Sequence, residues 1–209
     1  MTNKDSLNLY KEFFTDRDFE RLDLFHLLAE RYGIRSAVYP GSFVHITPSF
    51  VYPLTAYIDS DKRAKKFFAD PGLADFIASR KLYPEEADFS CYPQSYFEEI
   101  PELLGRFDLL ISQYAGFVSQ HAKRYLRPGG YLLANNSHGD ASMASIDEDF
   151  HLVAVVQGKD GSYRLTEKGL DSYMVPKKPV EITKALLEEC QRGIGYTKAA
   201  SMYVFQKAV

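Results

Sequence analysis

The sequence contains no tryptophan and only two cysteines, Cys91 and Cys190. Neither cysteine belongs to a C-x-x-C pair, which argues against a zinc site or a redox-active disulfide. Two isolated, reduced thiols are typical of a cytoplasmic protein. We therefore expect a cytoplasmic location and no metal site.

The sequence also lacks a long hydrophobic run and an excess of positive charge. Its net charge is −3, whereas a nucleic-acid-binding domain needs a basic face. No apolar stretch approaches the roughly 20 residues that span a membrane, and the first five residues are too polar to begin a signal peptide. We expect neither a nucleic acid nor a membrane as a partner, and the oligomeric state stays open.

What is present suits one globular domain. The chain has 209 residues, of which 45% are hydrophobic and 25% charged, enough to bury a full core without a second domain. We expect an N-terminal helical segment over residues 1–33, packed on a single domain over residues 34–209. In that segment, Thr15-Asp16-Arg17-Asp18 resembles a helix-capping box, and Gly33 suits a helix end.

Short apolar runs alternate with helical patterns along the rest of the chain, as expected for an α/β fold. We count seven strands, and most of them are separated by a helix, which favours a doubly wound, mostly parallel sheet with helices on both faces. The last strand lacks a simple crossover from the sixth, so an antiparallel orientation is expected for it. The expected strands cover residues 34–39, 54–58, 87–91, 107–112, 131–134, 150–157 and 201–206.

The turn after the first strand and the end of the second form a candidate nucleotide site. Gly41 has no Cβ, so a ligand can approach the backbone of the turn Tyr39-Pro40-Gly41-Ser42. Asp59 ends the second strand 18 residues after Gly41, where a carboxylate can accept hydrogen bonds from ribose hydroxyls. The simpler alternative is that Pro40-Gly41 is an ordinary turn and Asp59 an ordinary helix cap.

The strand Phe-Asp-Leu-Leu-Ile-Ser at 107–112 is followed by a helix and by Tyr-Leu-Arg-Pro-Gly-Gly-Tyr-Leu-Leu-Ala-Asn-Asn at 125–136. In this order the two segments resemble the class I S-adenosylmethionine-dependent methyltransferases, from about residue 20 to the C-terminus. The resemblance implies a seven-stranded sheet of order 3-2-1-4-5-7-6 with strand seven antiparallel, and S-adenosylmethionine as the cofactor.

The resemblance also implies which residues surround that cofactor, all near the carboxyl ends of strands one to four. The methionine part of the cofactor would be lined by Tyr39, Pro40, Gly41 and Ser42. The ribose would be held by Asp59, and the adenine would lie beside Ser60 and between Cys91 and Tyr92. The methyl group would lie near Ser112 and Gln113.

Three further residues are candidates to face a methyl acceptor, which we expect to be a small molecule. Tyr114 follows strand four, His45 follows the first turn, and His138 follows strand five, so all three belong to the carboxyl edge of the sheet. A histidine there can act as a general base, although it can equally be an ordinary loop residue. The loop around His138 also holds Asn135, Asn136 and Asp140, but their spacing matches no known metal site.

Some features keep other functions open. The first turn carries one glycine where the family usually has three, and Tyr39 stands where it usually has an acid. Together with Phe43, these changes favour an alternative: a cofactor-free binding or structural module. A nucleotide-binding enzyme of another class is a weaker alternative, because Gly193-Ile194-Gly195 follows no strand. The sequence also has no Asn/Asp-Pro-Pro-Tyr motif, so methylation of a base amine is not expected.

Overall fold

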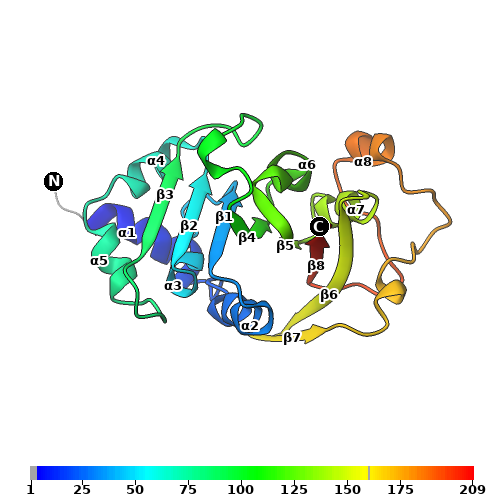
Figure 1. The fold of residues 1–209 in the computed structure, drawn as a ribbon, viewed down its shortest axis with the longest axis horizontal. Helices are drawn as coiled ribbons and strands as arrows, with labels where there is room; N and C mark the ends of the chain where they lie inside the picture. The colour runs from blue at the N-terminus through cyan, green and yellow to red at the C-terminus, as the bar shows by residue number, and fades with distance from the viewer. Residues whose placement is uncertain (1–3, 160) are drawn as a thin grey trace. The chain divides into compact units, whose positions relative to one another are not determined.

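The computed structural model describes residues 4–159 and 161–209 (Figure 1). Asp160, which the sequence places in a turn, lies outside the described residues. The chain forms two compact units, one ending at Glu98 and the other covering Glu99–Val209. The expected division into a helical segment and a single domain stays a prediction.

The first unit is built on three parallel strands, β1 (Ser36–Pro40), β2 (Leu54–Ile58) and β3 (Asp88–Tyr92) (Figure 1). β2 lies in the middle, with Tyr39 of β1 opposite Tyr57 and Tyr57 opposite Cys91 of β3. The five residues of β1 are all buried, as expected for a strand covered on both faces. Since the strands are parallel, their carboxyl ends share one edge, where the first turn and Asp59 are located.

Helices connect these strands, and their positions correct one expectation. The capping box predicted at Thr15 is wrong, because the chain forms a π-helix over Lys11–Thr15 and the next helix begins only at Leu22. The Thr15 hydroxyl donates to Glu20 instead of capping a helix. The predicted end at Gly33 is confirmed by its φ of +65°. The helices of this unit are α1 (Lys4–Tyr10), η1 (Lys11–Thr15), α2 (Leu22–Tyr32), α3 (Pro48–Val51), α4 (Lys62–Phe68) and α5 (Leu73–Ala78).

The second unit contains five strands in the order β4-β5-β8-β6-β7. β4 pairs with β5 in parallel, whereas the pairs β5–β8, β8–β6 and β6–β7 are antiparallel. The predicted antiparallel last strand is therefore confirmed. The strands are β4 (Phe107–Ser112), β5 (Leu126–Ala134), β6 (Phe150–Lys159), β7 (Ser162–Thr166) and β8 (Met202–Lys207).

The predicted seven-strand order is wrong at the end of the chain, because the described residues form eight strands. The extra strand is β7, which the sequence presents only as a short extended piece. It pairs with β6 as a hairpin, from Val155 opposite Thr166 to Lys159 opposite Ser162. The last strand is therefore β8, inserted between β5 and β6. The α/β class itself is confirmed.

The helices of the second unit are short, with at most seven residues each. They are η2 (Pro101–Leu103), α6 (Val118–Ala122), η3 (Lys123–Tyr125), α7 (Asp140–Ser145), η4 (Leu170–Tyr173) and α8 (Lys184–Cys190). β5 begins at Leu126, and its pairing with β4 shifts register between Phe107 and Leu109. Among residues 4–159 and 161–209, no helix is long and apolar enough to cross a membrane.

Candidate functional site

The turn after β1 is held by the backbone of β2. The Gly41 N–H donates to the Ile58 carbonyl at 2.8 Å, and Gly41 has a φ of +66°, a conformation that glycine adopts without strain. Ser42 is buried, and its hydroxyl donates to the Phe43 carbonyl at 3.4 Å. Pro40, the last residue of β1, is buried as well. Only the backbone at Gly41 is therefore suited to close approach by a ligand.

Asp59 lies at the end of β2 and holds this turn in place. One carboxylate oxygen accepts the Phe43 N–H at 2.7 Å, and the other accepts the Asp61 N–H at 2.8 Å. A carboxylate offers about four acceptor positions, so each oxygen can accept one more hydrogen bond. The side chain is only partly buried, which leaves these positions within reach of a ligand.

Phe43 follows the turn directly. Its φ is +50°, which is unusual for a side chain of this size. Its ring centre lies 5.1 Å from that of Phe13, and the Arg63 guanidinium carbon lies 4.6 Å from it. The ring is thus fixed by an aromatic contact and a cation–π contact. Neither of these two partners was predicted from the sequence.

His45 and Tyr39, two of the predicted site residues, face the core of the first unit. The His45 ring stacks on Phe14 at 4.3 Å, and its side chain is 1% exposed. Its Nε2–H donates to the Glu20 carbonyl at 3.0 Å, so Nδ1 accepts from the Tyr39 hydroxyl at 3.3 Å. Burial lowers the pKa of His45 to about 3. The ring has no free nitrogen with which to accept a proton from a ligand.

The other predicted residues of the first unit lie at the same sheet edge as Asp59. Ser60 is exposed, and Cys91 and Tyr92 are partly buried. The Tyr92 carbonyl accepts the Asp59 N–H at 3.1 Å, so β3 reaches the acid directly. Burial, with a smaller contribution from the Asp59 charge, raises the pKa of Cys91 to about 12. The thiol therefore stays protonated, and a nucleophilic role is not supported.

In the second unit, a buried carboxylate at the start of α7 is hydrogen-bonded to the last residue of β4 and to α6. Asp140, 2% exposed, accepts hydrogen bonds from the Ser112 hydroxyl and from the Ser119 N–H and hydroxyl. Burial raises its pKa to about 6, and the hydrogen bonds from Ser112 and Ser119 oppose that shift. Ser112, predicted to lie near the methyl group, thus uses its hydroxyl to hold Asp140. The part played by Ser119 was not foreseen.

Tyr114 and His138, both predicted to face the acceptor, lie close together. Their rings meet edge to face with centres 6.4 Å apart, and both side chains are exposed. Tyr114 has a φ of +60° directly after β4. Gln113, beside it, is buried, and its amide contacts the Met202 sulfur at 3.6 Å.

The tautomer of the neutral His138 ring follows from its neighbours. The Asn135 Oδ1 can only accept, so the Ser137 hydroxyl donates to it at 2.9 Å. The Ser137 oxygen then accepts the Nδ1–H of His138 at 3.0 Å, so the lone pair of the neutral ring lies on Nε2. Asn135 itself keeps a buried Nδ2 for which the described residues offer no hydrogen-bond partner.

The described residues contain no cluster of three or more histidine, cysteine, aspartate or glutamate side chains able to hold a metal ion. His138 and Asp140, considered together at the sequence level, differ sharply in environment. One is exposed, and the other is buried among serine donors. The absence of a metal site stays a prediction for the whole chain.

Comparison with known proteins relates this arrangement to one fold. No protein-family model matches the sequence, and no curated protein does. The structure is similar to that of the O-methyltransferase TomG from Streptomyces achromogenes, solved in complex with S-adenosylmethionine. The TM-score is 0.52 at 14% identity, over 78% of this chain and 87% of that one. It is also similar to a Corynebacterium glutamicum protein, with a TM-score of 0.52 at 12% identity, over 99% of this chain and 89% of that one.

The chain therefore has the fold of the class I methyltransferases. The resemblance carried by the segments 107–112 and 125–136 is confirmed at the level of the fold. Identities of 14% and 12% show a shared fold and do not show a shared reaction. Function therefore has to be argued from the residues at the carboxyl ends of the strands in each unit.

Proposed function

We propose that this protein is an S-adenosylmethionine-dependent methyltransferase that acts on a small molecule. The observation that carries the proposal is Asp59, a partly exposed carboxylate at the end of β2 with acceptor positions to spare. The fold supports it, since TomG has the same fold and was solved with S-adenosylmethionine.

The acid fits the ribose of that cofactor. The two ribose hydroxyls are donors, and each Asp59 oxygen has one acceptor position that the protein does not use. The Phe43 N–H and the Asp61 N–H also fix the carboxylate before a ligand arrives, which reduces the entropy lost on binding. In this proposal Gly41 lies against the methionine part, and Ser60, Cys91 and Tyr92 surround the adenine.

When bound, S-adenosylmethionine supplies a methyl group activated by a sulfonium. The chain then has to orient the acceptor and, for an acceptor that loses a proton, receive that proton. His138 is suited to this task, because the lone pair of its neutral ring lies on Nε2 and its side chain is exposed beside Tyr114. His45, also predicted as a candidate base, is better suited to a structural role, since both of its nitrogens are hydrogen-bonded in the core.

Calorimetric titration with S-adenosylmethionine tests the proposal. We expect Asp59→Ala to weaken binding by about 1–3 kcal/mol, the cost of leaving ribose hydroxyls without a charged acceptor. Asp70→Ala is the matched control, because Asp70 also accepts a backbone N–H, that of Gly72 at 2.8 Å, away from the end of β2. Equal affinity of the Asp59→Ala variant and the native chain would remove the acid from the site.

One observation favours a second candidate, a methyltransferase-like module without a cofactor. The Phe43 ring is held between Phe13 and Arg63 in the turn whose N–H meets Asp59. If that ring fills the space of the cofactor, neither S-adenosylmethionine nor S-adenosylhomocysteine will bind to the native chain. Binding of either one with micromolar affinity excludes this second candidate.

A further inference from the structure

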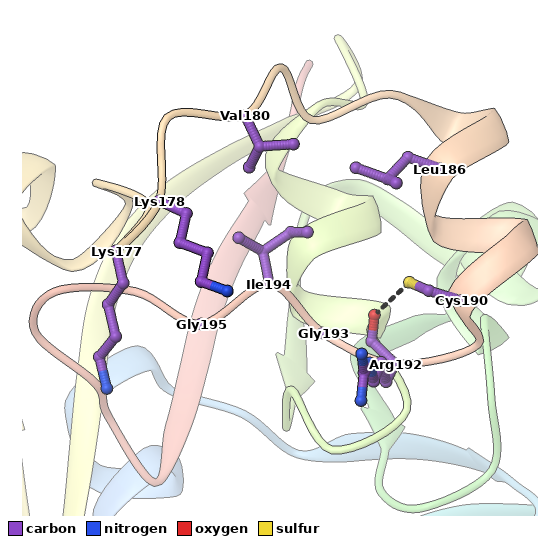
Figure 2. Close-up of a pocket in the computed structure, with 9 residues that line it drawn as sticks. All are labelled: Lys177, Lys178, Val180, Leu186, Cys190, Arg192, Gly193, Ile194 and Gly195. Atoms are coloured by element: carbon purple, nitrogen blue, oxygen red, sulfur yellow. Dashed lines mark hydrogen bonds between the residues drawn. The ribbon is translucent and has the colours of Figure 1, made fainter.

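A pocket of about 480 Å³ lies in the second unit, between α8 and the segment that leads into β8 (Figure 2). Three parts of the chain line it: residues 177–180, helix α8 and residues 192–195. Its volume falls within the range of small-molecule sites. The lining residues are Lys177, Lys178, Val180, Leu186, Cys190, Arg192, Gly193, Ile194 and Gly195.

Hydrogen bonds hold the walls of the pocket in place. The Lys177 N–H donates to the Gly195 carbonyl at 2.8 Å, and an antiparallel bridge pairs Pro176 with Tyr196. On the opposite wall, the Thr183 hydroxyl caps α8 by accepting the Leu186 N–H. The Cys190 thiol donates to the Arg192 carbonyl at 3.2 Å (Figure 2). The pocket is therefore a built part of the fold and not a gap between loose loops.

One wall packs directly on the loop that carries His138. A Cβ on Gly193 would lie 2.1 Å from the Asn136 carbonyl oxygen, so only glycine fits there. The Asn136 amide donates to the Ile194 carbonyl at 3.0 Å. A Cβ on Gly139, the residue after His138, would lie 3.0 Å from the Arg192 carbonyl. The pocket is thus adjacent to the carboxyl end of β5, where α/β folds bind ligands.

The chemistry of the lining selects for one class of ligand. Val180, Leu186 and Ile194 make the inner surface apolar, and Figure 2 shows Lys178 extending toward Ile194. Lys177, Lys178 and Arg192 supply three cations, no carboxylate lines the pocket, and none of the three pairs with an acid in the described part of the chain. An apolar pocket edged only by cations is complementary to an anion with an apolar body.

We propose that this pocket binds the methyl acceptor and that the acceptor is a hydroxy carboxylate with an aromatic or aliphatic body. Its hydroxyl oxygen would take the methyl group as the sulfonium becomes a thioether, and the hydroxyl proton would pass to Nε2 of His138. The acidic group of the acceptor lies among Lys177, Lys178 and Arg192, and its apolar part lies against Leu186 and Ile194. The acceptor role depends on the function proposed above. Binding of the carboxylate does not, so the two can be tested separately.

Binding is tested with anilinonaphthalene sulfonate, a fluorescent apolar anion, on the full chain, which has no tryptophan to interfere. We expect naphthoate to displace the probe at concentrations at least tenfold lower than naphthalenemethanol, its neutral analogue. A triple variant, Lys177→Gln, Lys178→Gln and Arg192→Gln, should lose this preference. The control, Lys62→Gln, Lys66→Gln and Lys168→Gln, removes the same charge from exposed positions elsewhere and should keep it.

Turnover is tested by S-adenosylhomocysteine formation from hydroxynaphthoate and from naphthol. We expect the carboxylate to be the better substrate and the triple variant to raise its KM at least tenfold with little change in kcat.

Equal displacement by naphthoate and naphthalenemethanol, or an unaltered triple variant, overturns the pocket proposal even where S-adenosylmethionine binds. Selective naphthoate binding without turnover in a chain that binds S-adenosylmethionine overturns the acceptor role. Selective binding in a chain that does not bind S-adenosylmethionine supports the carboxylate site and contradicts the methyltransferase.

Discussion

At the scale of single residues, the buried titratable groups His45 and Asp140 make the free energy of unfolding depend on pH in opposite directions. Burial lowers the pKa of His45 to about 3 and raises the pKa of Asp140 to about 6. His45 contributes stability that is present above its unfolded pKa and is lost as the pH falls. Asp140 contributes stability that is present at low pH and is lost as the pH rises through about 6.

We expect His45→Gln to make the free energy of unfolding less dependent on pH below about pH 7. Glutamine can accept from the Tyr39 hydroxyl and donate to the Glu20 carbonyl, but it does not become charged. Between about pH 7 and pH 4, the free energy of unfolding of the native chain should fall by roughly 3 kcal/mol more than that of the variant. Urea unfolding at both pH values measures this difference, in which the contribution of Asp140 cancels.

The matched control for this prediction is His151→Gln, because His151 is exposed on β6. Its profile should parallel that of the native chain. If the His45→Gln profile also runs parallel to the native one, His45 is not the buried neutral group that the geometry describes.

At the scale of elements, the sequence predicted the strands that are buried and apolar. Leu54–Ile58 and Phe107–Ser112 were placed to the residue, since continuous apolar runs bounded by turns have few alternatives. β7 was not counted as a strand, because its partner β6 supplies the hydrogen bonds and none of its own residues is fully buried. The start of β5 was missed because its early residues, Arg127 to Gly130, contain a proline and two glycines.

Candidate site residues were predictable where a single element positions them. Asp59 follows directly from the end of β2, and Tyr114 and His138 from the ends of β4 and β5. The hydrogen-bond partners were not predictable, because Phe13, Arg63 and Ser119 come from other parts of the chain. For the same reason the sequence could not show that Tyr39 and His45 face each other in the core.

Gly193 tests how the pocket wall is attached to the loop after β5. We expect Gly193→Ala to destabilise the fold by about 2 kcal/mol or more, because its Cβ would collide with the Asn136 backbone. Gly195→Ala is the matched control two residues away, where the new Cβ would meet only the Lys177 side chain at 3.8 Å. It should change the unfolding free energy by less than about 0.5 kcal/mol. Equal urea midpoints for the two variants would show that the wall is not tied to Asn136.

At the scale of the whole molecule, the sequence established the class and left the chemistry open. The segment 125–136 marks the fold, and similarity to TomG agrees with it. Neither reveals whether the turn at Gly41 still admits a cofactor, because that depends on the Phe43 ring and on contacts far apart in sequence. Ligand-dependent stability therefore distinguishes the three functions that the sequence left open.

We expect S-adenosylmethionine and S-adenosylhomocysteine to raise the melting temperature, and NAD and NADP to leave it unchanged. A ligand at one hundred times its Kd stabilises the native state by about 2.7 kcal/mol. In a chain of 209 residues this corresponds to a shift of roughly 5–10 °C. A thermal-shift panel measures all four ligands, and the Asp59→Ala variant should lose most of the shift. No shift with any ligand supports the cofactor-free module, and a shift with NAD or NADP alone supports an enzyme of another class.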